Sequence, residues 1–307
     1  MESKEVKYFL DNYENIIKSL SENSTKLKDL SQYESVRESL KALVSNILKT
    51  SVEIHFFGSR VIGLATEESD LDIFVEVDES FHKTFTKTNE FLDQFKKISS
   101  ALDKSSEWTV KESDLITTNG FSTRSSQLVR HLFTSQPEAV SLFHFIKKWI
   151  NLNEFYGFSG YTYTIVLLLI FFLQSKNFMP SIETIQQNLP KEFIQSWEVQ
   201  FDPNLNLNAY KTTKISDYKK HIHEFFKFYS EFDYSQVMSV YDGLIYEENK
   251  YKKIHPNFLL NGINIGGPTN RGKNYGVVDE IQKNRFVTLC GYSSLSLFEK
   301  FLENKIK

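Results

Sequence analysis

The pattern of hydrophobic and polar positions divides the chain into an α/β part and a mostly helical part. Up to residue 48 the apolar residues recur three and four positions apart, which predicts two or three helices. Runs rich in β-branched and aromatic residues then predict strands over 52–57, 71–77 and 108–118, with a helix over 81–102. The run 71–77 alternates apolar and acidic residues, so one face of this strand is expected to be buried.

Beyond residue 120 helical spacing dominates, and there is almost no strand signal until about residue 286. Helices are expected over 125–133, 138–150, 161–173, 182–187 and 215–229. The most hydrophobic run, Ile165 to Leu173, is far shorter than a membrane span and is typical of a buried helix. Five of the 12 glycines and Pro268 fall between Asn261 and Gly276, which predicts an exposed, shaped loop.

These patterns predict a two-domain protein of the class α/β plus α. A small mixed sheet backed by helices is expected over residues 50–125. Residues 1–49 and 126–307 together are expected to form a helical domain, with a cleft between the two. At 307 residues the chain is long enough for two separate cores, and one large domain is the alternative that its length leaves open.

Composition and charge limit the cellular compartment and the kinds of binding partner that are expected. Cys290 is the only cysteine, so neither an intrachain disulfide nor a cysteine-based zinc site can form. The charged N-terminus has no apolar signal core, so an intracellular location is expected, cytoplasmic in preference to nuclear or mitochondrial, with no membrane partner. With 36 basic and 39 acidic residues the formal net charge is −3, without the basic excess typical of duplex-binding proteins. Contact with RNA is therefore expected to be local, weak or supplied by a partner.

The candidate chemistry lies where the first two predicted strands meet. Asp70 and Asp72 occupy alternate positions, so their carboxylates should face one side, where like charges repel unless a cation lies between them. Divalent ions held there could activate a hydroxyl group and stabilise a leaving pyrophosphate. Gly58 permits a tight turn after the first strand, and Ser59 offers a hydroxyl and backbone N–H groups to phosphate oxygens. The alternative for such an Asp-x-Asp pair is solvated charge on a surface strand.

The order of several motifs resembles that of one protein family. Phe57-Gly58-Ser59 followed by Ser69-Asp70-Leu71-Asp72 resembles the signature of the DNA polymerase β-like nucleotidyltransferases. Later segments resemble the non-canonical poly(A) polymerase and terminal uridylyltransferase branch: Asp114 to Asn119, Phe145 to Trp149, Phe158 to Tyr161, and Ile215 to Asp233. The resemblance extends over about residues 50–280. It implies a nucleotidyltransferase domain at 50–125 and a poly(A)-polymerase-associated domain in the helical part.

The resemblance implies an enzyme that adds ribonucleotides, UMP or AMP, to RNA 3′ ends without a template. Its metal ligands for Mg²⁺ or Mn²⁺ would be Asp70, Asp72 and Asp114, and Asp114 would also act as the base for the attacking 3′-hydroxyl. The nucleotide would be bound by Gly58, Ser59, Asn119, Ser125, Lys147, Tyr161, Lys273 and Asn274. The partners would be a ribonucleoside triphosphate, an RNA 3′ end and an RNA-binding adaptor protein.

Several positions depart from the family pattern. An Asn that commonly touches the ribose aligns with Ser125, a second Lys one helical turn beyond Lys147 aligns with Asn151, and a His that favours uracil in some members aligns with Lys273. Asp114 is alternatively a loop residue beside Glu112. These departures keep a second hypothesis open, a catalytically inactive nucleotidyltransferase fold that binds protein or RNA.

Overall fold

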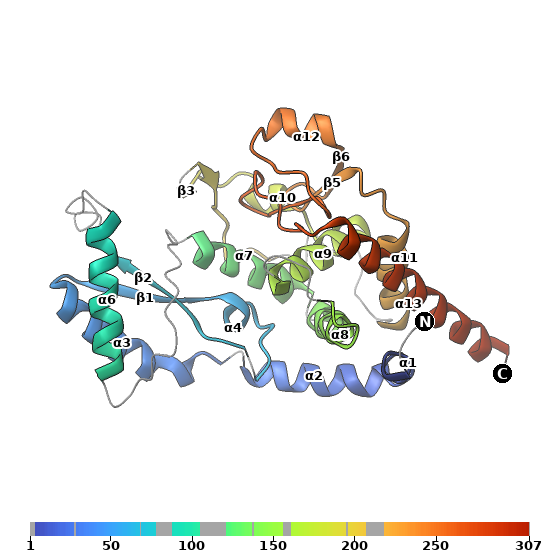
Figure 1. The fold of residues 1–307 in the computed structure, drawn as a ribbon, viewed down its shortest axis with the longest axis horizontal. Coiled ribbons are helices and arrows are strands. Elements are labelled where there is room, and N and C mark those ends of the chain that lie inside the picture. The colour runs from blue at the N-terminus through green and yellow to red at the C-terminus, as the bar shows by residue number, and fades with distance from the viewer. Residues whose placement is uncertain are drawn as a thin grey trace. The chain divides into compact units, whose positions relative to one another are not determined.

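The structure is a computed structural model in which the chain forms two compact units. The smaller unit comprises residues 26–127, and the larger unit comprises residues 1–25 and 128–307. The structure describes residues 4–27, 29–67, 69–77, 88–104, 121–136, 138–155, 161–194, 196–206 and 218–306. Figure 1 shows the helices and strands along the chain. The predicted class, α/β plus α, is confirmed, because the described chain is helix-rich with small sheets.

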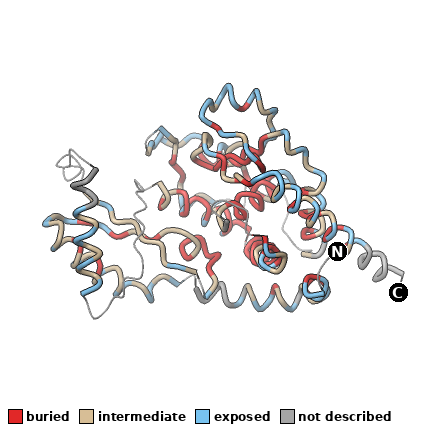
Figure 2. Tube along the Cα trace, in the orientation of Figure 1, coloured by how far each residue is buried: buried red, intermediate tan, exposed pale blue. Residues whose placement is uncertain are grey.

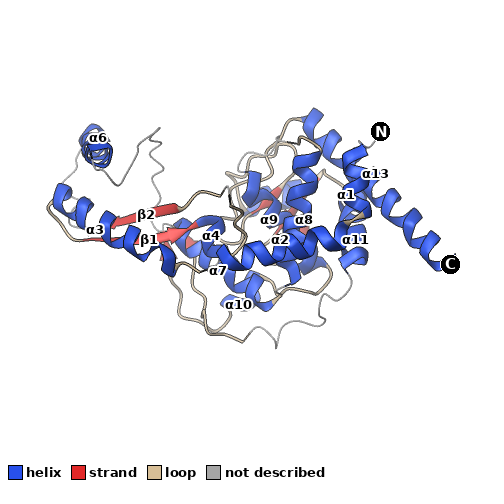
Figure 3. Ribbon diagram, turned by 90° about the horizontal axis from the view of Figure 1, so that it is seen from below, coloured by secondary structure: helices blue, strands red, loops and turns tan. Residues whose placement is uncertain are grey.

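The smaller unit is built on a two-stranded antiparallel sheet. Strand β1 (Val52–Phe57) pairs with β2 (Asp72–Val77), from Val52 opposite Val77 to Phe57 opposite Asp72. Alternate residues of β1 are buried, as the strand period requires. The helical elements are η1 (Ser31–Tyr33), α3 (Glu34–Leu48), α4 (Gly58–Ile62) and α6 (Thr88–Lys104) (Figures 1 and 3). The two longer helices, α3 and α6, contact each other.

Helix α3 belongs to the core of this unit. Its residues Leu40 and Val44 are buried in one cluster with Val52, Ile54 and Phe56 of β1. Residues 26–49, which the sequence pattern assigns to the helical domain, therefore lie in the smaller unit. The reason is that the apolar stripe of α3 has its complementary surface on the sheet. The predicted strand 108–118 lies outside the described residues.

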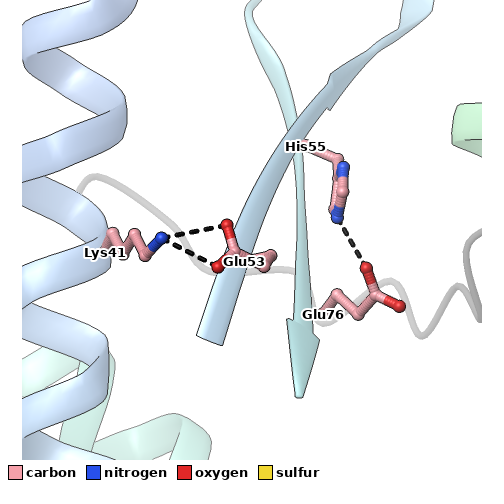
Figure 4. A network of polar contacts seen from close by, with 4 residues as sticks. All are labelled: Lys41, Glu53, His55 and Glu76. Carbon is pink, nitrogen blue, oxygen red and sulfur yellow. Dashed lines mark hydrogen bonds and ion pairs between the residues drawn. The ribbon is translucent and has the colours of Figure 1, made fainter. Parts of the chain in front are cut away.

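The opposite face of the sheet carries charged residues. Glu53 and Glu76 are direct cross-strand partners, an arrangement in which like charges repel. Each has a basic neighbour (Figure 4): Lys41 Nζ lies 2.8 and 3.0 Å from the two Glu53 carboxylate oxygens, and His55 Nε2 lies 2.6 Å from Glu76 Oε2. The hydrogen bond from Lys41 lowers the pKa of Glu53. Glu53 therefore has an ion-pair partner within the protein, and Glu76 has a hydrogen-bond partner.

The larger unit is mainly helical and buries its most hydrophobic segment. Its helices are α1 (Lys4–Asp11), α2 (Tyr13–Leu27, to residue 25), α7 (Phe121–Ser135, from residue 128), α8 (Glu138–Leu152), α9 (Tyr161–Ser175), α10 (Ile182–Gln186), α11 (Tyr218–Glu231), α12 (Glu248–Ile254) and α13 (Glu280–Ile306). Every residue from Ile165 to Leu173 is at most 1% exposed, which confirms the predicted buried helix (Figure 2). None of the helices in the described ranges is both long and apolar enough to cross a bilayer.

Short strands in the larger unit were not predicted from the sequence. Strands β5 (Gln236–Ser239), β6 (Leu244–Glu247) and β7 (Ile265–Gly266) form a sheet in the order β6-β5-β7, in which β5 is antiparallel to β6 and parallel to β7. A hairpin pairs β3 (Phe193–Ile194) with β4 (Trp197–Glu198). Strands of two to four residues offer too few positions for an alternating pattern to be recognised. Residues 280–306 form the single helix α13.

A hydrogen bond between α8 and α13 provides a test of packing in the larger unit. Trp149 is fully buried, and its indole N–H donates to Ser293 Oγ at 2.9 Å. Ser293→Ala leaves this donor without its acceptor, so we expect the free energy of unfolding in urea to fall by about 1–3 kcal/mol. Thr288→Ala, at an exposed position of the same helix, should change it by less than about 0.5 kcal/mol. Equal effects of the two substitutions would contradict this account.

Candidate functional site

A glycine turn brings the end of β1 next to an aspartate of β2. Gly58 follows β1 with φ of 76°, a left-handed conformation that favours glycine, and α4 begins there. Asp72 is the cross-strand partner of Phe57. A Cβ atom added to Gly58 would lie 1.8 Å from Asp72 Oδ2, which no side chain could tolerate. The absence of a side chain at Gly58 is therefore what lets the carboxylate lie against the turn.

The two aspartates of the motif lie close enough to interact. Asp72 is the first residue of β2 and is half-buried, whereas Asp70 lies two residues earlier and is exposed. Burial raises the pKa of Asp72, and the negative charge of Asp70 raises it further. A raised carboxyl pKa shows that the surroundings disfavour the ionised form. A bound cation would relieve both effects, so this pair fits a metal ion chemically.

Asp70 and Asp72 differ in one respect from the acids farther along the sheet. Glu53 and Glu76 each have a basic partner, but no ion pair between residues of the described ranges includes Asp70 or Asp72. The solvated-surface alternative does not account for a half-buried carboxylate whose pKa is raised. A half-buried carboxylate beside a second carboxylate is chemically suited to hold a cation.

Two positioning contacts were missed in the sequence. Ser126 is buried on α7, and its Oγ accepts a hydrogen bond from the Gly58 N–H at 3.0 Å. Arg60, on α4, donates from Nε to the Asp70 carbonyl at 3.2 Å and from Nη2 to the Ser69 carbonyl. The pattern of hydrophobic residues carries no signal for either contact, because each joins residues that only the fold brings together.

Two further residues that the sequence assigns to the nucleotide site, Ser59 and Ser125, lie in the smaller unit. Ser59 is half-buried in the first turn of α4, and its carbonyl accepts from the N–H groups of Gly63 and Leu64 at 3.0 and 2.9 Å. Ser125 is buried beside Ser126 on α7. Asp114 and Asn119 lie outside the described residues. Within the described ranges no group of three or more His, Cys, Asp or Glu side chains could hold a metal ion. The described acidic residues of the candidate site are therefore Asp70 and Asp72.

Three predicted residues lie on helices or loops of the larger unit. Lys147 is half-buried on α8, with its Nζ 6.0 Å from the centre of the Phe143 ring. Tyr161 is the first residue of α9, a position whose side chain is outside the description. Lys273 is exposed, with its Nζ 5.0 Å from the centre of the Tyr275 ring. Lys273 is thus available to a ligand at the surface of the loop.

Asn274 holds the glycine-rich loop together. Its Oδ1 accepts from the N–H groups of Ile265 at 3.2 Å and Gly276 at 2.9 Å, and its Nδ2 donates to the Leu259 carbonyl at 3.0 Å. Further acceptors for Nδ2 are the carbonyl of Asn261 and Oδ1 of Asn264. The side chain therefore has a clear structural role, and a contact with nucleotide stays a prediction.

The glycine-rich loop corrects one expectation from the sequence. It was predicted to be exposed, yet residues 262–269 are all buried, as are Asn274 and Gly276. The reason is that β7 pairs with β5, and the side-chain amide of Asn274 is hydrogen-bonded to other residues of the loop. Thr164 adds a link to α9, because its Oγ1 donates to the Tyr275 carbonyl at 2.5 Å.

Comparison with known proteins agrees with this geometry. Residues 34–131 match the nucleotidyltransferase domain family. The crystal structure of mtPAP in complex with ATPγS is 16% identical, with a TM-score of 0.73 over 96% of this chain and 70% of that chain. The Cid1 poly(U) polymerase with bound MgGTP is 17% identical, with a TM-score of 0.69 over 94% of this chain and 93% of that chain. A cytoplasmic RNA terminal U-transferase is 16% identical, with a TM-score of 0.64 over 91% and 94%.

The matched range contains the Gly58 turn and both aspartates, and the structural similarity extends through the helical unit. Residues 34–131 thus match the nucleotidyltransferase domain model, and the chain shares its fold with mtPAP, the Cid1 poly(U) polymerase and the terminal U-transferase.

Proposed function

We propose that this protein adds ribonucleotides, UMP or AMP, to RNA 3′ ends in a metal-dependent reaction. The observation that carries the proposal is the pair Asp70 and Asp72 at the Gly58 turn, two interacting carboxylates without a basic partner among the described residues. Nucleotidyl transfer requires this chemistry, because charge on the reacting phosphate and the leaving pyrophosphate must be neutralised.

Mg²⁺ or Mn²⁺ would be held by Asp70 and Asp72, with Asp114 proposed as the third ligand from the family resemblance. These hard cations prefer carboxylate oxygens, and when bound they neutralise phosphate charge and favour ionisation of the attacking hydroxyl. Asp114 is also the proposed base for the RNA 3′-hydroxyl. Ser126 and Arg60 would act by holding the Gly58 turn and the Asp70 segment in place.

Nucleotide contacts are proposed from the resemblance for Gly58, Ser59, Asn119 and Ser125 in the smaller unit. Lys147, Tyr161, Lys273 and Asn274 are proposed to contribute from the larger unit. The solved relatives support a triphosphate ligand, because mtPAP structures contain ATPγS, GTP and UTP, and the Cid1 structures concern UTP selectivity. We further propose that an RNA-binding adaptor selects the RNA, because the net charge of −3 provides no general affinity for phosphates.

The first prediction concerns the aspartates. Asp70→Ala and Asp72→Ala should each lower the rate of extension of a labelled RNA by at least about 100-fold in the presence of Mn²⁺ and UTP or ATP, because the metal loses a ligand. Asp103→Ala, at an exposed position on α6, should leave the rate unchanged. If the wild-type protein extends no RNA with any nucleotide, the proposed activity is wrong and the inactive binding module remains.

The second prediction concerns stability and the Asp72 carboxyl. Its pKa is raised in the folded protein, so the folded state binds more protons than the unfolded state between the ordinary and the raised value. Stability is therefore lost as pH rises through this window, and the ionised carboxylate destabilises the fold at neutral pH. Asp72→Asn should raise the melting temperature of the metal-free protein at neutral pH, a difference that disappears below the ordinary carboxyl pKa.

The same variant should lose its response to ligand. Wild-type protein should melt at a higher temperature when Mn²⁺ and UTP or ATP are added, because ligands that bind the folded state stabilise it. Asp72→Asn should show little of this increase. An Asp72→Asn variant that is less stable without metal and still responds to Mn²⁺ would contradict the assignment of Asp72 as a metal ligand.

The third prediction concerns nucleotide choice. The ammonium group of Lys273 can donate to a carbonyl oxygen of uracil, whereas adenine has no carbonyl. If Lys273 contacts the base, Lys273→Ala should lower kcat/KM for UTP about tenfold relative to that for ATP, the loss of one charge-assisted hydrogen bond. Lys253→Ala, exposed on α12, is the control for loss of a surface charge. An unchanged UTP to ATP ratio would show that Lys273 does not read the base.

A further inference from the structure

Arg60 is a buried arginine that is hydrogen-bonded to the backbone of the candidate metal site. Its residue exposure is 9%, although arginine is among the side chains least often buried. No ion pair between described residues includes it, and its Nη1 has no hydrogen-bond partner among them. Burying a cation without an acidic partner is costly, so its retention calls for a specific role.

The guanidinium group is committed to the backbone that leads into β2. Nε donates to the Asp70 carbonyl at 3.2 Å, and Nη2 donates to the Ser69 carbonyl. Ser69 is held a second time, because its Oγ accepts from the Thr66 N–H at 2.9 Å and its N–H donates to the Thr66 carbonyl at 3.0 Å. Arg60 therefore holds the main chain of Asp70 through its carbonyl and forms no ion pair with the Asp70 carboxylate.

The orientation of the guanidinium is itself supported. Its central carbon lies 5.5 Å from the centre of the Tyr33 ring, and Tyr33 packs edge-on against Phe56 of β1 at 6.3 Å. A planar group with several N–H donors can reach two successive carbonyls while its face rests on a ring. Lysine would carry the same charge, but its single ammonium group lacks the planar set of N–H donors that reaches both carbonyls.

We propose that Arg60 is the positioning residue of the metal site, which holds Asp70 so that its carboxylate and that of Asp72 meet at one divalent cation. The inference rests on the proposed function and deepens it. Residues that orient metal ligands typically change metal affinity or activity by about 10- to 100-fold when replaced. A purely structural arginine would change stability but not the affinity of the folded protein for metal.

The experiment measures binding of Mn²⁺ alone to the full chain by isothermal titration calorimetry, together with hydrogen–deuterium exchange over residues 64–72. Arg60→Met removes both hydrogen bonds and should weaken Mn²⁺ binding about 10- to 100-fold and speed exchange in this segment. Arg60→Lys keeps the charge without the fork and should give an intermediate loss. Circular dichroism establishes that each variant is folded, and if Arg60→Met is not folded, Arg60→Lys alone decides.

Arg37→Met is the matched control. Arg37 also lies over an aromatic ring of this unit, 4.6 Å from the centre of Phe56, but it pairs with Glu34 rather than with the segment before β2. It should bind Mn²⁺ as the wild type does. The inference is overturned if folded Arg60 variants bind Mn²⁺ with the affinity of Arg37→Met, or if the wild type binds no Mn²⁺.

Failure of the inference can be told apart from failure of the proposed function. RNA extension with an unchanged Mn²⁺ dependence in Arg60→Met would overturn the role of Arg60 and leave the activity intact. Mn²⁺ binding that requires Arg60, without any RNA extension by the wild type, would support the role of Arg60 and overturn the activity.

Discussion

The approach of the Asp72 carboxylate to the α-carbon of Gly58 is the constraint on which the candidate site depends. It requires a residue without a side chain at the turn, a left-handed backbone there, and a register in which Asp72 lies opposite Phe57. Ser126 supports this arrangement by accepting the Gly58 N–H. The result is a half-buried carboxylate whose pKa is raised by burial and by the neighbouring charge of Asp70.

One face of a small sheet thus carries acids of two kinds. Glu53 is paired with Lys41, and Glu76 is hydrogen-bonded to His55. Asp72 lies on the same face of the pair, because residues directly opposite across antiparallel strands point to one side. Asp70 and Asp72 have no ion pair among the described residues, and this difference from Glu53 and Glu76 is the basis for proposing a cation there.

In the larger unit the corresponding organisation is a loop built around one amide. Asn274 satisfies backbone groups from several points of the loop, and Thr164 ties the loop to the start of α9. Lys273 is left exposed on this framework. A loop with little regular structure can hold a side chain in a defined place when its backbone polar groups are satisfied internally.

The sequence by itself determined the motif, the class of fold and the main helices. Gly58 could be recognised because only glycine tolerates such a turn, and Ile165 to Leu173 because a continuous apolar run must be buried. Tertiary structure alone decided that α3 packs on the sheet, that two- to four-residue strands form around Met238, and that residues 262–269 are buried. It also decided the hydrogen bonds from Arg60 to the Ser69 and Asp70 carbonyls. These features depend on contacts between residues distant in the chain, and local periodicity carries no information about which distant surfaces will meet.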